Sequence, residues 1–72
     1  MSWNVRMVGS LNELKALIDA AKKDGWLSVE CYIPPDLQLP TEDLARERGY
    51  KPIFIFGQVV DCYIMTRCCI LW

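Results

Sequence analysis

The segment from Pro52 to Trp72, PIFIFGQVVDCYIMTRCCILW, decides the fold because it holds the densest run of apolar side chains and three of the four cysteines. Gly57-Gln58 divides it, and a glycine in the first position of a two-residue loop is typical of a type II′ hairpin turn. We therefore predict a strand from Ile53 to Phe56 that pairs with a strand starting at Val59. The pattern leaves open whether this last strand runs to the end or bends near Thr66 into a fifth strand.

Regular alternation along the last strand divides its side chains between two faces of the sheet. Free cysteine packs as a small hydrophobe, so we expect the face that includes two cysteines, together with Cys31, to lie on the core. Zinc is disfavoured because these cysteines lie within strands and not in C-x-x-C pairs on loops. The core face is Val60, Cys62, Ile64, Thr66, Cys68, Ile70 and Trp72; the other is Val59, Asp61, Tyr63, Met65, Arg67, Cys69 and Leu71.

A strand, a helix and a second strand are predicted in the first half of the chain. Residues 3–8 alternate, which predicts a half-buried strand with Met7 toward the core and Arg6 on the opposite side. Ser10 to Glu13 matches a capping box at the start of a helix over residues 11–24. Residues 26–33 return to a period of two. The helix stripe is Leu11, Leu14, Leu17, Ile18 and Ala21, and the second strand turns Leu27, Val29, Cys31 and Ile33 to the core.

A loop and a short second helix connect these elements to the final segment. Pro34-Pro35 ends the second strand, and Leu37 and Leu39 are expected to pack beneath the domain edge. Thr41 is expected to cap a helix that ends near Gly49, with an i,i+4 pair between Glu42 and Arg46. The chain is thus predicted to be one α/β domain over residues 1–72, of the α+β-like kind. Its order is β-α-β-α-β-β, with a mixed sheet of about four strands and two helices on one face.

Composition excludes several functions. The chain has 72 residues, a net charge of −1 and no histidine. Without a basic run, nucleic-acid binding by counterion release is disfavoured. Without histidine, the commonest general base and metal ligand is missing, so we expect neither an enzyme nor a metal or other cofactor. No stretch approaches the roughly 20 apolar residues that cross a bilayer, so we expect no membrane partner and a cytoplasmic location.

The sheet face away from the helices is the predicted binding surface. Aromatic and arginine side chains are enriched in protein interfaces, and this face combines both with carboxylates. We therefore expect a small protein-binding module that regulates or inhibits another protein, of a kind often encoded by phages. The alternative is a nucleic-acid- or small-ligand-binding domain that stacks bases on the same aromatic rings. The candidate residues are Arg6, Trp26, Glu30, Tyr32, Asp61, Tyr63 and Arg67.

The chain end is predicted to be a second contact surface. Cys69, Ile70, Leu71 and Trp72 would form an exposed apolar edge strand, and such strands pair with other chains. The simplest partner is a second copy of the chain, which predicts a homodimer. Deletion of residues 70–72 would then weaken the dimer before it unfolds the domain.

Overall fold

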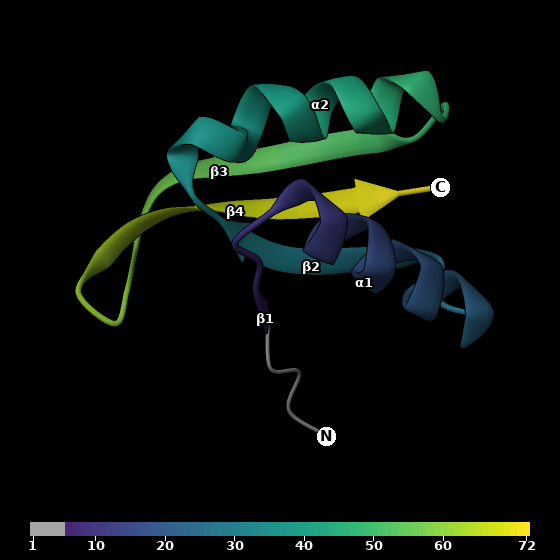
Figure 1. The fold of residues 1–72 in the computed structure, drawn as a ribbon, viewed down its shortest axis with the longest axis horizontal. Coiled ribbons are helices and arrows are strands. Elements are labelled where there is room, and N and C mark those ends of the chain that lie inside the picture. Colours follow the sequence, from purple (N-terminus) through teal and green to yellow (C-terminus); the bar gives the residue numbers. More distant parts are fainter. Residues whose placement is uncertain (1–5) are drawn as a thin grey trace.

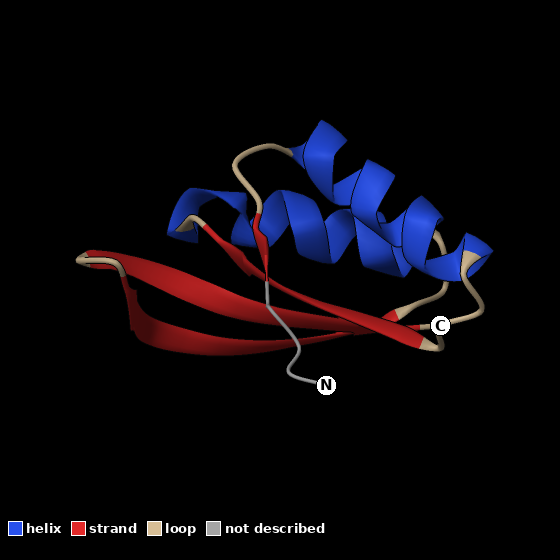
Figure 2. Ribbon diagram, turned by 90° about the horizontal axis from the view of Figure 1, so that it is seen from below, coloured by secondary structure: helices blue, strands red, loops and turns tan. Residues whose placement is uncertain are grey.

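The computed structural model describes residues 6–72, and it shows two helices packed on one face of a four-stranded sheet (Figures 1 and 2). This arrangement confirms the predicted fold class. The predicted strand positions 3–5 lie outside the described residues. The elements are β1 (Arg6–Met7), α1 (Leu11–Lys23), β2 (Ser28–Ile33), the 3₁₀ turn η1 (Pro35–Leu37), α2 (Gln38–Glu47), β3 (Lys51–Val60) and β4 (Tyr63–Leu71).

The sheet has the order β1-β2-β4-β3, with β1 and β2 parallel and the other neighbours antiparallel. β4 therefore lies inside the sheet and is hydrogen-bonded along both edges. The prediction that the chain end forms an exposed edge strand is wrong. Trp72 is also held in place, because its indole Nε1 donates to the carbonyl of Trp26 over 2.9 Å and its backbone N donates to that of Leu27 over 3.3 Å.

The core lies between the helices and the inner face of the sheet. Cys31, Cys68 and Phe54 form one row across β2, β4 and β3. The predicted stripe of α1 packs on this face through the buried Leu14 and Ile18, which confirms the helix and its orientation. The buried core cluster is Val8, Leu14, Ile18, Val29, Cys31, Ile33, Leu44, Ala45, Cys68 and Ile70.

Helix α1 begins as predicted. The backbone N of Glu13 donates to Ser10 Oγ over 3.2 Å, and Glu13 Oε2 accepts from the backbone N of Gly9 over 3.0 Å. The carboxylate thus reaches one residue further back than in the usual capping box. The contact with Ser10 satisfies an amide of the first helical turn, which has no partner within the helix.

Helix α2 begins earlier than predicted. The chain turns directly after Pro34 through η1, and α2 starts at Gln38 with Pro40 in its first turn, where proline is tolerated. Thr41 is therefore a buried helical residue and not a cap, and its Oγ1 has no hydrogen-bond partner among the described residues. Leu37 packs against the core as expected, but Leu39 is exposed. The expected Glu42–Arg46 pair is present at 2.6 Å.

The hairpin turn is formed by Asp61-Cys62, so the prediction of a turn at Gly57-Gln58 is wrong. Both turn residues have positive φ, 48° and 69°, as a type I′ turn requires, and Val60 pairs with Tyr63 across it. Gly57 instead lies in a bulge of β3, where its φ is 69°. The turn also exposes Cys62, which was predicted to face the core. β4 is a single strand from Tyr63 to Leu71.

Replacement of Cys62 by glycine is expected to stabilise the hairpin. A side chain at positive φ is strained, and Asp-Gly is a preferred type I′ pair. We expect Cys62→Gly to raise the free energy of unfolding by about 0.5–1 kcal/mol in urea titrations followed by circular dichroism. Cys62→Ala is the matched control, since it removes the thiol but keeps Cβ. Equal stability of the two variants would contradict a strained turn.

Candidate protein-binding face

The side of the sheet away from the helices is uncovered, and we call it the open face (Figure 2). Residues paired across neighbouring strands share a face, so the strand registers define its rows. One row crosses all four strands through Met7, Tyr32, Arg67 and Ile55. The next row is Glu30, Cys69 and Ile53, and the third is Ser28, Leu71 and Lys51.

An ion pair lies at the centre of the open face. Arg67 Nη2 is 2.5 Å from Glu30 Oε2, and both side chains are partly exposed. The hydrogen bond from Arg67 to Glu30 and their opposite charges raise the pKa of the guanidinium. Glu30 of β2 thus pairs with an arginine of the neighbouring strand β4. Because the two charges neutralise each other, the centre of the face, as formed by residues 6–72, offers no unpaired cation for a phosphate.

Apolar side chains flank this ion pair on the β3 side. Ile53 and Ile55 are 53% and 49% exposed, and Leu71 of β4 is 38% exposed. They lie in three successive rows of the sheet, one row apart, so their exposed surfaces adjoin. Large aliphatic side chains that reach solvent from a sheet face are the composition expected at the centre of an interface and not at its polar rim.

The structure brings together three of the seven predicted contact residues. Glu30, Tyr32 and Arg67 lie side by side at the centre of the open face. Tyr63 lies on the same side of β4 but next to the hairpin turn, four residues from Arg67. Asp61 is a turn residue and projects from the end of the sheet.

Arg6 and Trp26 do not belong to the open face. Arg6 is paired with the buried Cys31, so it lies on the helix side, and Met7 takes the outer side. The predicted faces of β1 are thus reversed, because Val8 and not Met7 enters the core. Trp26 and Leu27 precede β2, which starts at Ser28; Leu27 is therefore exposed and not a core residue.

Ile53 and Ile55 were not identified as candidates from the sequence. The run Ile53-Phe54-Ile55-Phe56 is apolar at every position, so alternation does not indicate which residues face outward. The sequence nevertheless contained a signal for their exposure. β3 is apolar on both faces, and a chain this short cannot cover both sides of its sheet, so the apolar side chains on one face of β3 stay exposed.

The four cysteines have different environments, and all are free thiols. Cys31 and Cys68 are buried partners across β2 and β4, as predicted. The hydrogen bond with Cys31, together with burial, raises the pKa of Cys68. Cys69 lies half-buried on the open face, where partial burial and the carboxylate of Glu30 raise its pKa.

The reactivity of Cys69 is expected to depend on Glu30. Since the raised pKa lowers its thiolate fraction near pH 8, Cys69 should react slowly with iodoacetamide, and its rate should keep rising above about pH 9. Glu30→Gln removes the repelling carboxylate and leaves Arg67 nearby, so we expect faster alkylation of Cys69 by mass spectrometry. Cys62, exposed in the turn, is the internal control and should keep its rate. An unchanged Cys69 rate would contradict this electrostatic coupling.

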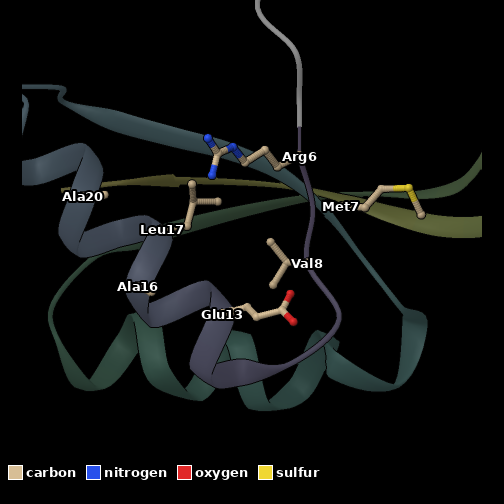
Figure 3. Close-up of a pocket in the computed structure, with 7 residues that line it drawn as sticks. All are labelled: Arg6, Met7, Val8, Glu13, Ala16, Leu17 and Ala20. Carbon is tan, nitrogen blue, oxygen red and sulfur yellow. The ribbon is translucent and has the colours of Figure 1, made fainter.

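A shallow pocket lies between β1 and the first turns of α1 (Figure 3). Figure 3 shows Arg6 and Val8 on the pocket side of β1 and Met7 pointing away. Its one carboxylate, that of Glu13, already accepts the hydrogen bond from Gly9. The pocket therefore offers one cation, Arg6, in an apolar wall formed by Val8, Ala16, Leu17 and Ala20. This chemistry points to no catalytic step.

Comparison with protein-family models, with curated proteins and with solved structures finds no match. No group of three potential metal ligands occurs within residues 6–72. Neither α1 nor α2, the two α-helices of that range, is long and apolar enough to cross a membrane.

Proposed function

We propose that the protein is a non-enzymatic protein-binding module whose open face binds another protein. The observation that supports this best is the exposed apolar surface of Ile53, Ile55 and Leu71 beside the Glu30–Arg67 ion pair. Interfaces combine such a centre with aromatic and arginine side chains, and Tyr32 and Arg67 adjoin it. By covering a surface of its partner, a module of this kind regulates or inhibits that protein. We place it in the cytoplasm, where thiols stay reduced.

A protein partner fits the open face better than a nucleic acid does. The net charge is −1, and Arg67 is paired with Glu30. Nucleic-acid affinity depends on unpaired cations that displace counterions from phosphates. We expect no rise in the fluorescence anisotropy of labelled single-stranded oligonucleotides when the protein is added at low salt. A rise that salt reverses would favour the nucleic-acid alternative.

The binding test uses two matched variants of β3. The face double variant, Ile53→Thr with Ile55→Thr, removes apolar surface from the open face and keeps β-branched side chains that favour strands. Val59→Thr makes a similar change on the opposite side of the same strand. Immobilised wild type and both variants are incubated with lysate of the native host, and the retained proteins are then purified and titrated.

We expect one protein to be retained by the wild type and by Val59→Thr and to bind the face double variant about tenfold to hundredfold more weakly. This range corresponds to truncation of two central contacts. Equal retention by all three chains would show that the open face is not the binding surface.

A further inference from the structure

The outer edge of β3 is a free edge of the sheet. In the strand order β1-β2-β4-β3, β3 is hydrogen-bonded to β4 on one side only. Within residues 6–72 no other element is hydrogen-bonded to the outer edge between Lys51 and Ile55. A free edge presents backbone N–H and C=O groups without partners, and such groups can pair with a strand of another chain.

The hairpin turn determines which backbone groups of β3 point outward. A two-residue type I′ turn is closed by residues that exchange hydrogen bonds, here Val60 and Tyr63. Along β4 the direction of the backbone groups alternates from this pair, so every second residue faces β3. Beyond the bulge, the β3 partners of these residues are Ile55 and Ile53. The backbone N–H and C=O of Phe54, between them, therefore point to the free edge.

The sequence around Phe54 fits this assignment. Pro52 also faces outward, and its missing N–H therefore leaves the pairing of β3 with β4 intact. Charged side chains are one means by which proteins prevent pairing at such an edge, yet no charged residue lies between Lys51 and Asp61. The bulge at Gly57 ends the regular part of the strand, so the free edge available for pairing is residues 52–55.

We propose that an extended segment of the partner protein pairs with this free edge as a fifth strand. The inference rests on the proposed function and specifies how the partner binds. An extended backbone carries donors and acceptors at the spacing of a strand edge, which makes it the complementary ligand. Side chains on one side of the added strand lie next to Ile53 and Ile55 and enlarge the apolar surface of the open face. The segment is therefore uncharged, with apolar side chains at alternate positions.

A second copy of the chain does not fit this edge. Helix α2 lies against β3 and runs along its outer side (Figure 1), in the layer that holds both helices (Figure 2). Antiparallel pairing of two copies of β3 would place both α2 helices on the same side of the joined sheet. The paired strands would lie about 4.8 Å apart, whereas packed helices need about 8–10 Å between their axes. A single added strand brings no second helix into this space.

Amide hydrogen exchange followed by NMR tests the geometry. In the free protein, the Phe54 amide should exchange at least about a hundredfold faster than those of Ile53 and Ile55, which face β4. The probe is the protein that the wild type retains from lysate of the native host, after purification. In its complex, exchange at Phe54 should slow by at least about tenfold. A Phe54 amide that is already protected in the free chain, or one unchanged in the complex, would overturn the inference.

A single backbone methyl group tests the added strand without altering any side chain. The chain is short enough for chemical synthesis by ligation at its cysteines. N-methylation of Phe54 removes the outward N–H and blocks an added strand, so the retained protein should bind at least about tenfold more weakly. The chain itself should keep its wild-type urea transition. N-methylation of Val59, whose amide points outward beyond the bulge, is the matched control and should leave binding unchanged.

The outcomes separate this inference from the proposed function. If the Phe54-methylated chain binds like the wild type while the face double variant binds weakly, the proposed function holds and the added strand is excluded. Equal weakening by methylation of Phe54 and of Val59 would also exclude pairing at residues 52–55. A wild type that retains no protein from the lysate would overturn both proposals.

Discussion

A chain that lacks residues 70–72 is expected not to fold. The deletion removes Ile70, which is fully buried in the central strand, and the ring of Trp72, which packs against Tyr50 at a centroid distance of 5.8 Å. It also breaks both hydrogen bonds from Trp72 to the segment that leads into β2. Loss of a buried isoleucine alone costs about 2–5 kcal/mol, and a domain of this size has a total stability of only about 4–11 kcal/mol.

The effect is measured by far-ultraviolet circular dichroism, with Trp72→Phe as the control. Phenylalanine keeps a ring against Tyr50 but loses the indole N–H that donates to the carbonyl of Trp26. We expect this control to fold with stability reduced by about 1 kcal/mol. If the truncated chain retained a cooperative urea transition, the chain end would be a peripheral contact strand, as the sequence alone suggested.

The second large effect is expected from Leu14→Ala in α1. Leu14 has no exposed surface and lies in the core cluster, so truncation leaves a cavity and should lower the free energy of unfolding by about 2–5 kcal/mol. Leu17→Ala makes the same chemical change one turn later in the same helix, where the side chain is only partly buried.

Because the helix propensity change is the same for both leucines, the difference between the two variants isolates core burial. We expect Leu17→Ala to cost less than half as much as Leu14→Ala in urea titrations. Equal losses would mean that α1 does not pack on the sheet through the face described above.

The parts of the fold that depend on residues close together in the sequence could be predicted from the sequence. The stripe of α1, the alternation of Val29, Cys31 and Ile33, and the order of the elements are all local patterns, and all are confirmed. The alternation also predicted that Glu30 and Arg67 share one face of the sheet, where they form an ion pair.

The errors arise where one local signal has two structural meanings. A glycine after a β-run indicates either a hairpin turn or a bulge, and Gly57 forms a bulge, while the turn at Asp61-Cys62 lacks a glycine. Likewise, an apolar strand at the chain end is either an exposed edge or an interior strand. Strand order decides between these meanings, and it is a property of distant pairing that the pattern of β4 alone does not contain.

Only part of the candidate site was predicted, because some strands alternate between polar and apolar residues and others do not. Glu30, Tyr32 and Arg67 were found because their strands alternate between polar and apolar residues. Ile53 and Ile55 were missed because β3 is apolar on both sides. Their exposure follows from the placement of both helices on one face, which leaves the other side of the sheet uncovered (Figure 2).

Site-specific photo-crosslinking in the native host tests the central claim, binding of another protein by the open face, most directly. A benzophenone amino acid replaces Ile53 on the open face or, in a separate control chain, Val59 on the opposite side of β3. From position 53 we predict an adduct with a different protein, and from position 59 no adduct with that protein. An open face that forms no adduct at position 53, while position 59 captures the different protein, would contradict the account.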